Sequence, residues 1–149
     1  MEDGGLGQRF AQVLADVRIL LEPGIAELAA LHATEEDIQR LFCICNAVEE
    51  KIRIGENYIE DDIAFHTCIA RCSKNKVVEQ LIPIIDTAVL MFVNITHRKL
   101  TEETIMTHRA VAEAIAQRDP LGARSAMMMH MTFNRTVIKE YIKNQPKNI

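Results

Sequence analysis

Asp62 and His66 are four residues apart, so their side chains share one face if this stretch is a helix. Ile59, Phe65 and Ile69 flank that face at helical spacing, which predicts that it points into the protein interior. A carboxylate or an imidazole buried without a partner is strongly unfavourable. A hydrogen bond, a counter-charge or a metal ion removes that penalty. The pair is therefore a candidate half of a metal site.

Two further histidines lie on apolar stripes nearer the C-terminus. His108 shares its stripe with Val111 and Ile115, and His130 shares its stripe with Met127. Each histidine taken alone is typical of a hydrogen-bonded core residue. Together with the first pair they form an Asp/His₃ set from three helices, and one shared metal ion explains all four buried polar side chains.

The four candidate ligands are Asp62, His66, His108 and His130. Imidazole and carboxylate suit Zn²⁺, which we expect here, and also Ni²⁺, Mn²⁺ or Fe²⁺. A divalent ion with one carboxylate leaves a net charge of about +1. We therefore expect a small anionic molecule to complete the coordination shell. His32 and His97 stand near helix ends beside polar residues and are predicted at the surface.

The elements that position these residues are all predicted helices. Apolar residues recur at the helical period along nearly the whole chain, and no stretch alternates like a strand. Helices are predicted over residues 7–31, 34–55, 57–72, 76–97, 101–118 and 119–143. Short connections then predict an all-α antiparallel bundle of six to seven helices.

Prolines and caps locate the helix boundaries. Pro23, followed by Gly24, is expected to kink or break the first helix, and Pro83 to bend the fourth. Thr34 and Thr101 are predicted N-caps before acidic residues. Asp119 followed by proline is a predicted start of the last helix.

Composition favours one ordinary globular domain over residues 1–149. The chain is 48% hydrophobic and 26% charged, and its formal charge of −4 argues against nucleic-acid binding by this chain alone. No signal peptide or membrane-spanning stretch is apparent, which favours a cytoplasmic location. The four cysteines lack zinc-ribbon spacing, so we expect reduced, core-filling thiols rather than a thiol site.

Several spaced motifs together resemble the FCD domain, the C-terminal effector-binding domain of FadR-type regulators in the GntR family of bacterial transcription factors. The resemblance covers about residues 9–142. Its motifs are Arg18 to Pro23 with Leu28-Ala29-Ala30, Thr34 to Ile38, Asp62-x-x-Phe65-His66 with Asn75 nine residues later, His108-x6-Ile115 with Asp119, and His130.

The resemblance implies a bundle of six or seven helices, a divalent metal on an Asp and three His, and a homodimer. The family's metal positions match the same four residues reached from periodicity. An organic acid, such as a hydroxy acid or sugar acid, is expected at the metal. Arg18 is the candidate partner of its carboxylate, since a guanidinium can form two parallel hydrogen bonds. Asn134 is a second candidate effector contact, and Asn75 is expected to cap the end of its helix.

One family feature is missing from the sequence. The regulators carry an N-terminal winged helix-turn-helix of DNA-binding type, and this chain lacks it. Either the sequence is a fragment or the protein is a stand-alone sensor. We expect a fragment, whose parent protein binds DNA.

The leading hypothesis is therefore a sensor domain, not an enzyme, that binds a small carboxylate at a metal and relays this to a DNA-binding domain. The alternative is a metal-dependent hydrolase using the same Asp/His₃ site. An interaction bundle without a ligand stays open as well. A di-iron bundle is excluded because no glutamate stands three residues before a histidine.

Overall fold

The structure, a computed structural model, describes residues 3–96 and 99–144, and every regular element among them is an α-helix. The helices are α1 (Asp3–His32), α2 (Glu35–Ile54), α3 (Ile59–Cys72), α4 (Lys76–Glu79), α5 (Ile82–Thr96), α6 (Thr101–Ala116) and α7 (Pro120–Asn144). The prediction of an all-α bundle is confirmed. His97 lies outside the described residues.

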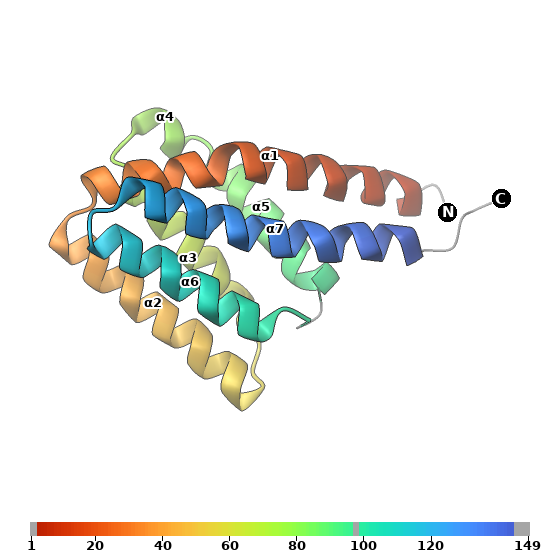
Figure 1. Ribbon diagram of the computed structural model, residues 1–149. Coiled ribbons are helices and arrows are strands. Elements are labelled where there is room, and N and C mark those ends of the chain that lie inside the picture. Colours follow the sequence, from red (N-terminus) through yellow and green to blue (C-terminus); the bar gives the residue numbers. More distant parts are fainter. Residues whose placement is uncertain (1–2, 97–98, 145–149) are drawn as a thin grey trace.

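The two longest helices, α1 and α7, lie side by side and run antiparallel (Figure 1). Helix α6 packs against α7 as the other half of a hairpin, and α2 packs against α6. Helix α3 lies behind α6 in Figure 1 and packs against α1, α2 and α5. This arrangement brings the middle of α3 close to the inner faces of α1, α6 and α7.

Helix α2 has the boundaries that the sequence predicts. The Thr34 hydroxyl accepts the N–H of Asp37 at 3.1 Å, and the Asp37 carboxylate accepts the N–H of Thr34 at 2.9 Å. This capping box satisfies two backbone donors at once. At the other end Gly55 adopts a left-handed conformation with φ of 78°, which glycine adopts without a steric penalty.

Three predicted helix boundaries are wrong. The predicted helix over residues 76–97 is two helices, because two successive tight turns at Gln80 and Leu81 separate α4 from α5. Pro83 lies in the first turn of α5, where its missing N–H costs nothing. Thr101 is the first residue of α6 and makes no cap, and Asn75 caps the start of α4, accepting the N–H of Val77 at 2.9 Å, rather than the end of α3.

Helix α1 continues through Pro23, so the predicted break does not occur. An internal proline costs a helix roughly 3 kcal/mol because it removes a hydrogen bond and crowds the preceding turn. The two turns that follow it bury Ile25, Ala26, Ala29 and Ala30, none more than 5% exposed. This burial in the core offsets the free-energy cost of the proline. The offset depends on tertiary packing, so the helical pattern of the sequence does not show it.

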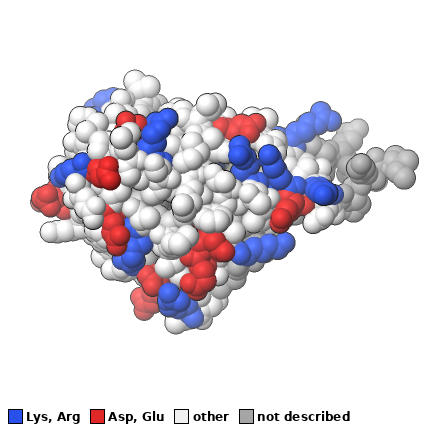
Figure 2. Space-filling model, in the orientation of Figure 1, with Lys and Arg blue, Asp and Glu red and all other residues white. Residues whose placement is uncertain are grey.

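The main core lies around α3. Its largest fully buried side chains are Leu41, Phe65, Ile69, Ile115 and Met127, from four different helices. Each lies on the helix face that the apolar period predicts. Most charged side chains lie outside, although Arg18, Glu22, Asp37 and Asp62 are buried. Basic and acidic groups are interspersed over the face shown in Figure 2.

The four cysteines are unpaired thiols, as predicted, but one of them does not fill the core. Cys45, Cys68 and Cys72 are buried, whereas Cys43 is exposed. Cys43 and Cys45 are two residues apart and therefore lie on different faces of α2. Among the described residues, no helix is both long and apolar enough to cross a membrane.

Candidate metal centre

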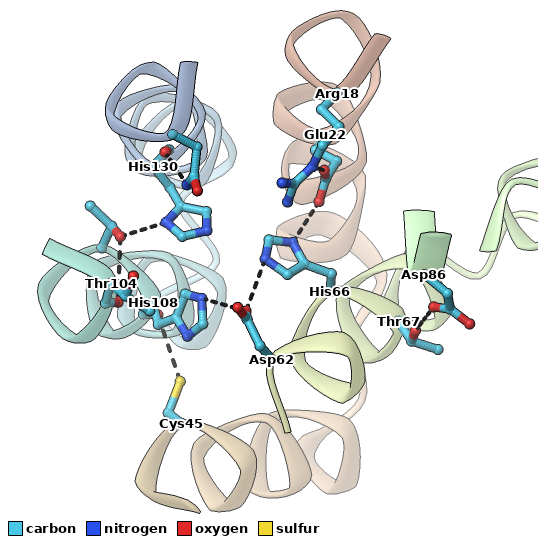
Figure 3. Close-up of polar contacts among 12 residues, drawn as sticks. Arg18, Glu22, Cys45, Asp62, His66, Thr67, Asp86, Thr104, His108 and His130 are labelled. Atoms are coloured by element: carbon cyan, nitrogen blue, oxygen red, sulfur yellow. Dashed lines mark hydrogen bonds and ion pairs between the residues drawn. The ribbon is translucent and has the colours of Figure 1, made fainter. Parts of the chain in front are cut away.

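The four predicted ligands lie together in the bundle interior (Figure 3). Asp62 and His66 project from α3, His108 from α6 and His130 from α7, and none is more than 6% exposed. One ring nitrogen from each histidine lies within 4.8 Å of the other two. The Oδ1 atom of Asp62 lies 3.5 Å from Nε2 of His66 and 3.3 Å from Nε2 of His108.

Local structure explains how residues far apart in sequence meet. The helical spacing of Asp62 and His66 puts both on the inner face of α3, one turn apart. The tight connection between α6 and α7 folds the two helices against each other, which brings His108 opposite His130. Asp119 fixes the start of α7, since its carboxylate accepts the N–H of Gly122 at 2.9 Å.

Several buried polar atoms of this cluster have no hydrogen-bond partner among the described residues. They include Oδ1 of Asp62 and Nε2 of both His66 and His108. The contacts of 3.3 and 3.5 Å between them meet the distance of an ion pair, but not the geometry of a hydrogen bond. Buried polar atoms without partners are rare in native proteins. Imidazole nitrogens and a carboxylate oxygen in one place fit a divalent transition metal.

Electrostatics favour the protonation states that a metal ligand needs at three of the four positions. Burial raises the pKa of the Asp62 carboxyl, but His108 and His66 lower it more, and the result lies well below the usual value. Burial lowers the pKa of His108. Burial together with the charges of His108 and His66 lowers the pKa of His130 much further. These shifts favour an ionised carboxylate and neutral imidazoles.

His66 behaves differently because a second carboxylate lies beside it. Burial lowers the pKa of His66, but Glu22 and Asp62 raise it more. Oε1 of Glu22 lies 2.5 Å from Nδ1 of His66. The other oxygen of Glu22 accepts a hydrogen bond from Nε of Arg18. Burial raises the pKa of Glu22, but Arg18 and His66 together lower it by more. The net pKa lies below the usual value, so this carboxyl stays ionised.

Glu22 is a site residue that the sequence reasoning missed. It is 3% exposed and stands one turn after Arg18 on α1. The sequence contains a sign of its burial. A glutamate four residues after an arginine can form an ion pair on one helix face, and this pair is next to apolar Leu21 and Ile25. The contact with His66, 44 residues away, had no such signal.

Thr107 is the second missed residue. It is 1% exposed, and its hydroxyl oxygen lies 2.8 Å from Nδ1 of His130. No spacing rule predicts this contact, because it crosses from α6 to α7. It depends on the angle at which the two helices pack.

Arg18 and Asn134, the predicted effector contacts, lie beside the cluster. Arg18 is 3% exposed, pairs with Glu22, and its guanidinium carbon lies 4.7 Å above the centre of the Phe92 ring. Asn134 is partly buried, and its amide nitrogen donates to the backbone carbonyl of His130 at 2.8 Å. Their roles toward an effector stay predictions. His32 is exposed, as predicted.

Comparison with known proteins places this chain in a family. The FCD domain family matches residues 13–133. An uncharacterized HTH-type transcriptional regulator of Bacillus subtilis (strain 168), YcbG, is 31% identical over 133 residues, covering 84% of this chain and 53% of the relative. The galactonate operon transcriptional repressor of Escherichia coli (strain K12) is 27% identical, covering 89% of this chain and 59% of the repressor.

A solved structure agrees with these relatives. Streptococcus agalactiae GntR superposes with a TM-score of 0.76 at 29% sequence identity, covering 87% of this chain and 60% of that chain. The present chain thus spans little more than half the length of the proteins that it matches. The relatives are transcription regulators rather than enzymes. The chain therefore belongs to the FCD domain family and is an FCD domain of the GntR type of transcription regulator.

Proposed function

We propose that this domain senses a small organic acid at a divalent metal ion held by Asp62, His66, His108 and His130. The observation that carries the proposal is the convergence of these four buried side chains from three helices, with unpartnered donor atoms facing one another. Zinc is the first choice for this donor set, and Ni²⁺, Mn²⁺ or Fe²⁺ would also suit it. The bound metal would supply a positive centre that attracts a carboxylate.

Arg18 is the residue that we assign to the acid's carboxylate. Glu22 accepts a hydrogen bond from Nε of the guanidinium, so the two terminal nitrogens can donate to the carboxylate of the acid. Figure 3 shows these nitrogens on the side of α1 that faces His130. Asn134 would contribute its amide oxygen, since its amide nitrogen is engaged with His130. The galactonate repressor among the relatives supports a hydroxy acid or sugar acid as the ligand.

The exposed apolar face of α1 supports a homodimer. Phe10, Val13 and Leu20 lie on one face of α1 and are 48%, 55% and 79% exposed. Apolar area of this kind is commonly covered by a partner. In the full regulator, a cytoplasmic dimer would bind DNA through winged helix-turn-helix domains outside this chain. The acid must bind the two dimer arrangements unequally, because otherwise no signal is transmitted.

A hydrolase is the weaker alternative. A metal-activated water needs a nearby base that can accept its proton, and a carboxylate is a common choice. Both oxygens of Glu22 are already engaged, by Arg18 and by His66, and Asp61 pairs with Lys51 at 2.5 Å. This arrangement favours binding over turnover.

The test combines metal analysis with titration. Elemental analysis of the purified domain should find about one equivalent of a divalent metal. Calorimetry of the metal-loaded domain against L-lactate, D-galactonate and related acids should then show binding. That binding should weaken in Arg18→Lys, which keeps the charge but loses the planar fork. Absence of metal after loading with Zn²⁺, or absence of binding to every acid, would overturn the proposal.

A further inference from the structure

We propose that Thr107 and Glu22 are positioning residues that set the tautomers of His130 and His66, so that each ring presents an unprotonated Nε2 to the metal. This inference rests on the proposed metal site. It adds two residues from α6 and α1 that do not bind the metal but decide which ring nitrogen can. Such outer contacts fix ligand orientation in metal sites generally.

The hydrogen bonds of Thr107 determine the direction of its contact with His130. The hydroxyl donates to the backbone carbonyl of Glu103 at 2.7 Å, one turn earlier on α6, and the Thr104 carbonyl lies 3.4 Å away. This is the usual back-bond of a helical threonine. A hydroxyl has one proton, so toward His130, at 2.8 Å, it can only accept. The ring therefore carries its proton on Nδ1.

Glu22 imposes the same tautomer on His66 by a different means. An ionised carboxylate only accepts hydrogen bonds, so Nδ1 of His66 at 2.5 Å must donate. The hydrogen bond from Arg18 to the other oxygen holds the carboxylate in place. In the neutral form of both rings the unprotonated nitrogen is then Nε2.

His108 lacks an anchor of this kind. Its Nδ1 has no hydrogen-bond partner among the described residues. Its ring is instead stacked on Phe65, with centroids 3.9 Å apart and an interplanar angle of 14°. Apolar stacking fixes the plane of the ring but not the position of its proton. The site therefore has two tautomer-fixed ligands and one that is held by packing alone.

The first experiment needs no metal. Two-bond ¹H–¹⁵N correlation spectra of the metal-free domain, recorded at about pH 8, report the tautomer of each neutral histidine. We expect the Nδ1–H form for His130 in the wild-type protein and in Thr107→Ser. We expect a mixture in Thr107→Val, which keeps the shape and removes the acceptor. An Nε2–H form for His130 in the wild-type protein would overturn the inference.

The second experiment measures Zn²⁺ affinity by competition with a chromophoric chelator. Thr107→Val and Glu22→Gln should each weaken binding about tenfold to a hundredfold, the usual effect of losing an outer contact. Thr107→Ser should stay close to wild type. Thr104→Val is the matched control, since Thr104 is buried on the same helix one turn away, and the hydrogen bond to the His130 ring found among the described residues is made by Thr107. It should also bind Zn²⁺ like wild type.

The outcomes separate this inference from the proposed function. If the wild-type domain binds no Zn²⁺ but shows the expected tautomers, the metal proposal fails, whereas the assignment of the tautomers to the contacts with Thr107 and Glu22 stands. If it binds Zn²⁺ and Thr107→Val, folded by circular dichroism, binds equally well, the role of Thr107 is refuted. If Thr107→Val does not fold, two other measurements test the role of Thr107. They are the tautomer of His130 in the wild-type protein and the Zn²⁺ affinity of Thr107→Ser compared with that of Thr107→Ala.

Discussion

Arg18 and Glu22 form a buried ion pair one turn apart on α1, with side chains 4% and 3% exposed. The pair also contacts a third group, because Glu22 holds His66 through its other oxygen. A carboxylate taken out of water depends strongly on such partners. The pair therefore links the stability of the bundle to the geometry of the candidate metal centre.

Removing the arginine alone should destabilise the domain strongly. Arg18→Met leaves the Glu22 charge buried with only His66 beside it, and this should lower the free energy of unfolding by about 3–5 kcal/mol. Urea unfolding of the metal-free protein measures this change in the free energy of unfolding. The double variant Arg18→Met/Glu22→Gln should recover part of the loss, since the unpaired charge is gone. Simple addition of the two single effects would contradict the buried pair.

Replacing His130 with alanine should lower metal content and metal-dependent stability together. Metal bound only to the folded state stabilises it by about 2.7 kcal/mol at a free concentration one hundred times the Kd. Zn²⁺ should therefore raise the melting temperature of wild type, and raise that of His130→Ala much less. His32→Ala is the control, since that histidine is exposed. Equal zinc content in wild type and His130→Ala would remove this residue from the site.

The capping box of α2 gives a prediction on acid stability that is independent of the metal centre. Burial raises the pKa of Asp37, but hydrogen bonds from Lys74, at 2.7 Å, and from Thr34 lower it below the ordinary value of 3.8. A lowered folded-state pKa stabilises the fold above the unfolded pKa. That contribution is lost as the pH falls through the folded pKa.

Asp37→Asn should therefore cost about 1 kcal/mol at neutral pH, the usual value of a cap, and the difference from wild type should shrink below about pH 4. Denaturant unfolding at a series of pH values measures it. Glu36→Gln, in the same first turn but exposed, is the matched control. A difference that persists unchanged into strong acid would show that the carboxylate charge is not the cause.

The apolar face of α1 predicts how the domain associates. If Phe10, Val13 and Leu20 pack against a second copy, Leu20→Glu should convert a dimer into a monomer, because a charge would be buried at the interface. Light scattering after size-exclusion chromatography measures the mass. Ile54→Glu, at the far end of α2, is the control and should remain dimeric. A monomeric wild-type domain would refute this interface.

The sequence alone determined most of the helices and the polar residues on their inner faces, because both follow from local periodicity. The spacing of Asp62 and His66 fixed their common face, and apolar stripes placed His108 and His130 inward. Helix starts were right where a side chain caps its own helix, as at Thr34 and Asp119. These are interactions within a few residues of sequence.

Only the tertiary structure decided what lies between helices. The continuation of α1 through Pro23 depends on the burial of the residues that follow the proline. The contact of Glu22 with His66 spans 44 residues, and that of Thr107 with His130 spans 23. No periodicity encodes such distances. They depend on the angles at which α1, α3, α6 and α7 pack, and these follow from side-chain interlocking across the whole core. A helical pattern shows that a residue faces inward, but the packing of the helices determines which residue it contacts in the core.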